Sequence, residues 1–246
     1  MSSRNATIKT IDVFYVLDMD RCLVNTEKLQ ALLQRVIERE LGIHPDEMNL
    51  ARREYERAGG SFDTAGYVMG VLDGRGMDGP SAWHDITRMF VQEAQAQDML
   101  EPYAAELLRR LRAEEVRYGI VTYGSDTWQL TKLEAAGLMA IPHLVTHDVV
   151  KARLIASWQH MKGFLVPTIL AGEQLLARRL VFIDDKPISF IGLPSSVQGI
   201  CAVSPGASWP DELMAQLPSN VSVTYGLHGA IELLFSHEDS AAVDKT

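Results

Sequence analysis

The sequence has few cysteines and no long apolar run, and each deficit excludes a class of protein. Two cysteines in 246 residues, Cys22 and Cys201, are too few for the disulfide framework of a small secreted domain. No uninterrupted apolar stretch approaches the roughly 20 residues that span a bilayer. The first residues also lack the apolar segment of a signal peptide. We therefore expect a cytoplasmic protein that does not enter a membrane.

Positive charge is also scarce. Lys and Arg total 23 against 32 Asp and Glu, which gives a formal net charge of -9. This balance argues against sequence-independent binding to nucleic acid or to an anionic membrane. The hydrophobic fraction of 47% and the charged fraction of 22% are those of an ordinary globular protein. We expect a small-molecule partner, and the sequence leaves the oligomeric state open.

The most informative segment is an apolar run with two aspartates directly behind it. Residues 13–17 read Val-Phe-Tyr-Val-Leu, and Asp18 and Asp20 follow. An uncharged run of β-branched, aromatic and leucine residues is typical of a strand buried on both faces. Open α/β sheets bind ligands at the carboxyl ends of such strands. Two close carboxylates repel unless a cation or shared proton compensates, so the pair indicates chemistry more than stability.

Helical and strand patterns follow this segment in two blocks. Apolar residues at helical spacing predict helices over residues 29–37, 62–72, 83–95 and 104–112, and another helix is expected to begin at residue 45. Strand signals then appear at 116–121, 143–146, 180–183 and 199–203, with helical segments such as 128–136 between them and a last helix at 229–235. Strands that alternate with helices predict a parallel sheet.

The predicted fold class is therefore α/β, with a doubly wound, Rossmann-like parallel sheet core and an inserted α-helical domain. We assign residues 1–26 and 113–235 to the core and residues 27–112 to the insertion. Residues 236–246 are polar, and we expect them to be a disordered tail.

Polar residues also end or follow the later strands, at the edge where the carboxyl ends of parallel strands meet. They are Thr122, Tyr123, Lys151, Asp184 and Asp185. Lys151 is a cation that could compensate the carboxylates.

This ordered set resembles the haloacid dehalogenase-like (HAD) phosphohydrolase superfamily, and the resemblance extends from residue 13 to about residue 203. The first motif of that family is an apolar run followed by Asp-x-Asp-x-Thr/Val-Leu, which Asp18, Asp20 and Leu23 match. Arg21 stands where glycine is frequent, and Cys22 stands where threonine or valine is frequent. The turn after Asp20 is therefore expected to differ in shape.

The other motifs are matched later in the chain. Thr122 matches the strand-end threonine of the second motif, and Asp184 and Asp185 match the acidic pair of the fourth. The lysine of the third motif has two candidates. Lys151 lies at a suitable distance after the third strand, whereas Lys162 is nearer to the acidic pair, and we favour Lys151.

The resemblance implies a Mg²⁺-dependent phosphatase that hydrolyses a small phosphorylated metabolite through an aspartyl-phosphate. It implies that Asp18 is the nucleophile and that Asp20 is the general acid and base, with a raised pKa. The implied phosphate-binding residues are Thr122, Tyr123 and Lys151. The implied metal site comprises Asp18, Asp20 through its backbone carbonyl, Asp184 and Asp185, the last of which orients the metal shell or Lys151.

Other functions remain open at this stage. A non-catalytic protein with this fold could bind a ligand or partner, and the departures at Arg21 and Cys22 favour that reading. Transfer of the phosphoryl group to an acceptor other than water is another alternative. Dehalogenation is disfavoured because Asp20 supplies the proton that a phosphate ester's leaving group needs.

Substrate choice is expected to depend on the insertion, which stands where members of the superfamily carry a helical cap. Its arginines could recognise a second anionic group: Arg52, Arg53, Arg57 and Arg75. Cys22 is expected to be a packing residue, since no activating histidine is near it in sequence. The substrate and the choice between Mg²⁺ and Mn²⁺ are not determined by the sequence.

Overall fold

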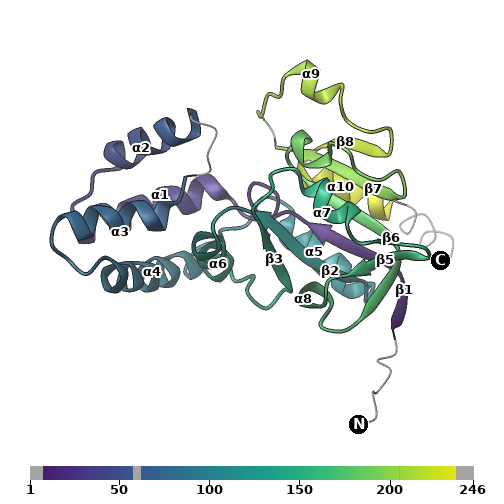
Figure 1. The fold of residues 1–246 in the computed structure, drawn as a ribbon, viewed down its shortest axis with the longest axis horizontal. Coiled ribbons are helices and arrows are strands. Elements are labelled where there is room, and N and C mark those ends of the chain that lie inside the picture. Colours follow the sequence, from purple (N-terminus) through teal and green to yellow (C-terminus); the bar gives the residue numbers. More distant parts are fainter. Residues whose placement is uncertain (1–7, 58–61, 205, 237–246) are drawn as a thin grey trace, which may run out of the picture. The chain divides into compact units, whose positions relative to one another are not determined.

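The computed structural model describes residues 8–57, 62–204 and 206–236. The tail predicted over residues 236–246 lies outside the described residues from position 237 onward. The strands are β1 (Lys9–Leu17), β2 (Arg117–Tyr123), β3 (His143–Thr146), β4 (Gln159–His160), β5 (Gly163–Val166), β6 (Leu175–Asp184), β7 (Val197–Val203) and β8 (Val221–Tyr225). The helices are α1 (Thr26–Leu41), α2 (Pro45–Arg57), α3 (Thr64–Gly74), α4 (Gly79–Gln95), α5 (Ala104–Ala113), α6 (Asp126–Ala135), α7 (Lys151–Ala156), α8 (Thr168–Ala171), α9 (Asp211–Met214) and α10 (Gly226–Phe235), with a 3-10 turn, η1, at Pro187–Phe190 (Figure 1).

The strands form one mainly parallel sheet. Its order is β3-β2-β1-β6-β5-β4, and β7 also pairs with β6 and in turn with β8. β1 is parallel to β2 and to β6, and β7 is parallel to β6 and to β8. The predicted fold class, a mainly parallel α/β sheet with a helical insertion between its first two strands, is confirmed.

The register of the central strands aligns their carboxyl ends. Leu17 of β1 lies opposite Ile120 of β2 on one side and opposite Ile183 of β6 on the other. Residues that follow these positions therefore meet at one edge of the sheet. This alignment brings Asp18 and Asp184 onto neighbouring strands.

β1 is buried on both faces, as its composition predicts. Side chains alternate along a strand, so Phe14 and Val16 face one side while Tyr15 and Leu17 face the other. All four are buried. On the first face, Phe14 and Val16 belong to a core that also contains Phe182. This packing fixes the position of the residue after β1.

An antiparallel hairpin, β4–β5, was not predicted. β5 pairs antiparallel with the first half of β6, whereas the second half of β6 pairs with β7. The turn depends on Gly163, which has φ +143°. Any other residue at this position would place its Cβ atom 2.2 Å from the carbonyl oxygen of Ala177. Strands of two and four residues are too short to show an alternating pattern in the sequence.

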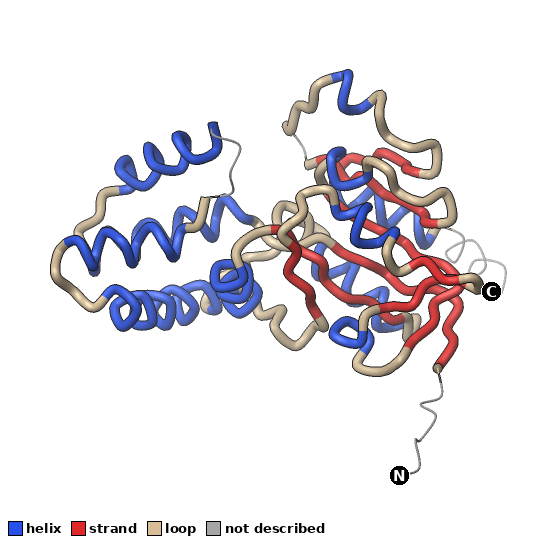
Figure 2. The backbone as a smooth tube through the Cα atoms, viewed as in Figure 1, coloured by secondary structure: helices blue, strands red, loops and turns tan. Residues whose placement is uncertain are grey.

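Contacts divide the chain into two compact units. The first comprises residues 1–24, 100–122 and 141–246, and it contains the sheet and α5; the second comprises residues 25–99 and 123–140, and it contains α1–α4 and α6. Figure 2 shows the helical character of the second unit. The domain boundaries given from the sequence remain a prediction.

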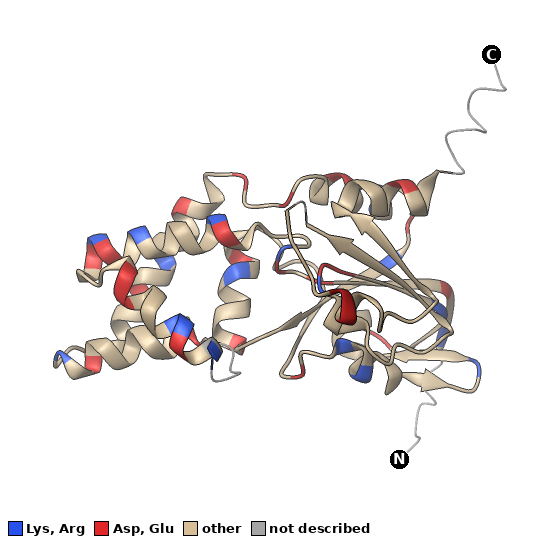
Figure 3. Ribbon diagram, turned by 90° about the horizontal axis from the view of Figure 1, so that it is seen from above, with Lys and Arg blue, Asp and Glu red and all other residues tan. Residues whose placement is uncertain are grey.

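The second unit is a helical assembly with its own apolar core. α4 packs against α1, α3 and α6, and the rings of Phe90 and Trp128 lie 5.9 Å apart. α1 begins after Asn25, whose side chain accepts a hydrogen bond from the Lys28 N–H at 2.9 Å. It ends at Leu41 before Gly42, whose φ of +60° lies in the left-handed region that glycine adopts without steric cost. Charged residues of both signs occur along the helices of this unit (Figure 3). Within the described residues, no helix combines the length and the apolar composition that a membrane span requires.

Candidate active site

The candidate site lies in the first unit, at the carboxyl ends of the central strands. Asp18 is the first residue after β1, and its backbone N–H donates to the carbonyl oxygen of Ile183 at 2.9 Å. This bond continues the pairing of β1 with β6 for one residue beyond the strand. The Asp18 side chain, which is 1% exposed, is therefore held at a defined position by its own backbone.

A tight turn follows Asp18. The carbonyl oxygen of Met19 accepts hydrogen bonds at 2.9 Å from the N–H groups of both Leu23 and Val24. Arg21 occupies this turn with φ +60°, in the left-handed region that glycine adopts without steric cost. This conformation gives a physical reason for the glycine that is frequent at this position. Here arginine adopts this conformation, and Asp20 beside it is half-buried.

Lys151 is the cation of the cluster. It begins α7, is 2% exposed, and donates from Nζ to Asp18 Oδ1 and, at 2.7 Å, to Asp184 Oδ2. Lys162, the other candidate, is exposed between β4 and β5. Lys151, and not Lys162, thus contacts the carboxylates of Asp18 and Asp184.

Three carboxylates converge beside this lysine. Asp184 is the last residue of β6, and one oxygen atom from each of Asp18, Asp184 and Asp185 lies within 4.8 Å of the others. Asp18 Oδ2 and Asp185 Oδ1 are buried and have no hydrogen-bond partner among the described residues. Hard divalent cations are bound by such all-oxygen sets. The triad could therefore hold a metal ion.

The charges of the cluster perturb its titration. Burial raises the pKa of the Asp18 carboxyl, and the neighbouring Asp184 adds to this rise while Lys151 opposes it. Burial also raises the pKa of Asp185, against the effect of Lys186. For Lys151, burial favours the neutral amine, but the two carboxylates outweigh it and raise the pKa. The lysine therefore stays charged.

Lys186 is a member of the cluster to which sequence reasoning gave no role. Its Nζ lies 3.9 Å from Asp185 Oδ1, and its backbone N–H donates to Asp184 Oδ1 at 2.8 Å. Burial favours the neutral amine, yet nearby carboxylates including Asp18 raise the pKa of Lys186. The sequence does contain a signal for this role, because Lys186 directly follows Asp184 and Asp185. The three carboxylates of Asp18, Asp184 and Asp185 thus lie beside two lysines, so acidic groups outnumber basic ones in the cluster.

Thr122 and Tyr123 end β2. Thr122 is fully buried, and its Oγ1 has no hydrogen-bond partner within the described part of the chain. Tyr123 is half-buried, and its carbonyl oxygen accepts a hydrogen bond from the side chain of Gln129. A buried hydroxyl without a partner is costly in a stable fold. Thr122 Oγ1 is thus a donor that a ligand oxygen could satisfy.

Cys22 is buried, as expected of a packing residue. Burial raises the pKa of its thiol well above the usual value, and the negative charges of Asp18 and Asp184 raise it further. A thiol in this environment stays protonated and is a poor nucleophile.

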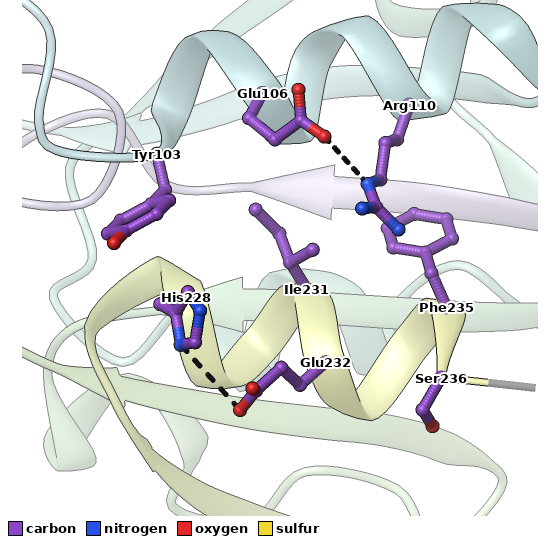
Figure 4. Close-up of a pocket in the computed structure, with 8 residues that line it drawn as sticks. All are labelled: Tyr103, Glu106, Arg110, His228, Ile231, Glu232, Phe235 and Ser236. Carbon is purple, nitrogen blue, oxygen red and sulfur yellow. Dashed lines mark hydrogen bonds and ion pairs between the residues drawn. The ribbon is translucent and has the colours of Figure 1, made fainter. Parts of the chain in front are cut away.

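A separate hollow of about 640 Å³ lies between α5 and α10 in the same unit (Figure 4). Its polar side chains lie close to one another: Arg110 contacts Glu106 at 2.8 Å, and His228 lies 3.6 Å from Glu232. The triad carboxylates do not line it. We therefore place the candidate chemistry at the strand ends.

Comparisons with known proteins agree on the fold. No protein-family profile matches the sequence, and no curated protein matches it. Solved structures do match. A candidate haloacid dehalogenase-like hydrolase from Burkholderia xenovorans has a TM-score of 0.55 and 16% identity, over 88% of this chain and 95% of that one.

Two further structures are similar over nearly their whole length. The candidate HAD-hydrolase YfnB from Bacillus subtilis, bound to magnesium, has a TM-score of 0.53 and 16% identity, over 91% of this chain and 98% of its own. A candidate β-phosphoglucomutase from Thermotoga maritima has a TM-score of 0.53 and 12% identity, over 92% of this chain and 99% of its own. The chain thus has the HAD-like hydrolase fold, with a helical insertion after β1 and an acidic triad at its strand ends.

Proposed function

We propose that the protein is a Mg²⁺-dependent phosphatase that hydrolyses a small phosphorylated metabolite through an aspartyl-phosphate. The observation that carries the proposal is the buried cluster of Asp18, Asp184, Asp185 and Lys151 at the strand ends. Burying three carboxylates, two of which have an oxygen atom without a hydrogen-bond partner among the described residues, is unfavourable for stability alone. Such an arrangement is expected at a functional site.

Asp18 is the proposed nucleophile. A carboxylate oxygen forms a bond to phosphorus as the bond from phosphorus to the ester oxygen breaks, which divides a difficult hydrolysis into two easier steps. The backbone bond to Ile183 and the contact with the buried Lys151 ammonium orient the carboxylate. Water then attacks phosphorus, and phosphate leaves with Asp18 regenerated.

The proposed phosphate-binding groups are Thr122, Tyr123 and Lys151. The unpartnered Thr122 hydroxyl supplies a hydrogen-bond donor, and the charged Lys151 ammonium supplies positive charge. Negative charge spreads over the phosphoryl oxygens in the transition state, where preorganised donors of this kind are most effective.

Asp20 is the proposed general acid and base. It donates a proton to the departing ester oxygen and later accepts one from the attacking water. Its half-buried position in the turn after Asp18 suits a group that must exchange protons with substrate and solvent.

Asp20→Asn is expected to separate substrates by leaving group. Turnover of an alkyl phosphate should fall by about 10²- to 10⁴-fold, since a poor leaving group needs the proton. Turnover of an activated aryl phosphate should fall much less. Steady-state rates on the two substrates check this. Equal losses on both would contradict the general-acid role.

The proposed metal is Mg²⁺, held by Asp18, Asp184 and Asp185 together with the backbone carbonyl of Asp20. The all-oxygen donor set, its two unpartnered carboxylate oxygens and the excess of carboxylates over lysines suit a hard divalent cation. When bound, Mg²⁺ would neutralise charge so that an anionic phosphate can approach an anionic nucleophile. The structure of YfnB bound to magnesium supports this choice over Mn²⁺.

Mg²⁺ is expected to stabilise the folded protein, and this effect tests the metal site without relying on turnover. Saturation to about 100 times the dissociation constant adds about 2.7 kcal/mol to the free energy of unfolding, which for a protein of this size raises Tm by several degrees. Differential scanning calorimetry with and without Mg²⁺ measures the shift. Asp185→Asn should remove it, whereas Asp85→Asn, an exposed acid on α4, should keep it. A shift that persists in Asp185→Asn would contradict the assigned ligand.

Two other functions use the same site. A binding-only protein would show the Mg²⁺ shift without phosphate release. A phosphotransferase would form the aspartyl-phosphate but pass the group to an acceptor other than water. The presence of both Asp18 and Asp20 argues against the binding-only protein.

A further inference from the structure

The second unit contains a hollow of about 560 Å³ on the α2–α3 side of the helical assembly. We call it the aromatic hollow, and it is lined by Ala51, Glu54, Tyr55, Phe62, Asp63, Gly66 and Tyr67. Its volume lies within the range of small-molecule sites. None of its residues belongs to the acidic cluster described above.

Aromatic rings form its walls. The centroids of Tyr55 and Phe62 lie 6.4 Å apart with the rings at 71°, and those of Phe62 and Tyr67 lie 5.5 Å apart at 48°. Tyr55 is 54% exposed, so part of this aromatic surface faces solvent. Exposed aromatic side chains grouped around a hollow present negative π faces to a ligand.

The lining also carries negative charge. Glu54 and Asp63 contribute carboxylates, and neither lysine nor arginine is among the residues that line the hollow in the described part of the chain. The arginines that the sequence suggested for an anionic group make other contacts. Arg52 donates to Gln30 Oε1 at 2.7 Å, and Arg75 donates to the carbonyl oxygen of Leu41 at 2.8 Å. The formal charges on the described side chains that line the hollow are thus all negative.

Asp63 is fixed in place. Its Oδ1 accepts a hydrogen bond from the Ser125 hydroxyl at 3.2 Å. Its Oδ2 lies close to Gly66, and a Cβ atom added at Gly66 would be only 2.6 Å from this oxygen. Glycine at this position is what allows the carboxylate to lie so close to α3. A carboxylate held in this way loses little entropy when it pairs with a cation.

We propose that the aromatic hollow binds an organic ammonium ion. Cations are attracted to aromatic faces, and fixed carboxylates add Coulomb attraction. The local structure already contains one such contact, because the Arg52 guanidinium lies 5.5 Å from the centroid of the Phe62 ring. A quaternary or primary ammonium group suits the remaining lining, in which aromatic surface and carboxylates occur together. The inference stands apart from the phosphatase proposal, since it uses no residue of that site.

Choline and its neutral isostere 3,3-dimethylbutan-1-ol test the proposal, because they have the same shape and differ in charge. Ligand-detected NMR titration of the full chain should show saturable choline binding, at least about fivefold tighter than that of the alcohol. Tyr55→Leu, Tyr67→Leu and Glu54→Gln should each weaken choline binding severalfold. The matched control is Tyr225→Leu, because Tyr225 is 85% exposed in the first unit.

Fold is checked for each variant by Tm. Glu54→Gln removes the charge of an exposed side chain and keeps its size. It therefore tests the proposal even if the loss of a tyrosine ring destabilises the helices. Equal binding of choline and the alcohol would mean that the hollow is only apolar and would overturn the proposal. So would choline binding that survives in all three variants, or the lack of saturable binding of choline.

Discussion

Asp18→Asn is expected to lower turnover of any phosphate ester by about 10³-fold or more while the protein stays folded. An amide cannot form the proposed bond to phosphorus, but it has nearly the same shape as the carboxylate. The substitution also removes one negative charge from a buried cluster that carries an excess of them. We therefore expect the Tm of the variant to equal or exceed that of the unaltered protein.

The measurement pairs steady-state turnover with mass spectrometry of the peptide that contains residue 18 after rapid acid quenching. The unaltered protein should carry a phosphoryl group on this peptide during turnover, and Asp18→Asn should not. Asp85→Asn, on the exposed surface of α4, is the matched control and should keep normal activity. Appreciable turnover by a folded Asp18→Asn protein would remove Asp18 from the nucleophile role.

Lys151→Ala is expected to have the second large effect, on stability and activity together. The lysine is buried, and its Nζ contacts Asp18 and Asp184, which are buried as well. Removing one partner of a buried ion pair leaves uncompensated charge and costs about 3–5 kcal/mol. In a protein of this size that loss lowers Tm by roughly 10 °C.

Calorimetry in EDTA isolates this effect from stabilisation by a bound cation. Lys162→Ala is the matched control, because Lys162 is exposed in the turn between β4 and β5. It should leave Tm and turnover unchanged, whereas Lys151→Ala lowers both. A large loss of activity in Lys162→Ala with little change in Lys151→Ala would reverse the assignment of the third motif.

Much of the fold could be predicted from local pattern. β1 is an uncharged apolar run because the strand is buried on both faces, and α1 ends where Gly42 permits a left-handed backbone. These features depend on neighbouring residues in the sequence, so they are visible there. The β4–β5 hairpin is not visible in this way. It forms because β5 pairs with the first half of the long β6. Pairing between distant segments produces no recognisable sequence pattern in strands as short as these.

The candidate site also contains some residues that the sequence pattern identifies and others whose contacts depend on the fold. Asp18, Thr122 and Asp184 could be found because each stands at the end of a recognisable strand. Which of Lys151 and Lys162 contacts the carboxylates depends on the fold, and the spacing of the two lysines in the sequence does not predict it. The aromatic hollow likewise depends on the ring contacts of Phe62 with Tyr55 of α2 and Tyr67 of α3, which spacing alone does not predict.

The central claim is tested most directly by phosphate release from an activated aryl phosphate, measured with and without Mg²⁺. We predict release that requires Mg²⁺, that is abolished by EDTA, and that returns when Mg²⁺ is restored. No release from folded protein that shows the Mg²⁺-dependent rise in Tm would contradict the proposed phosphatase and favour a protein that only binds its ligand.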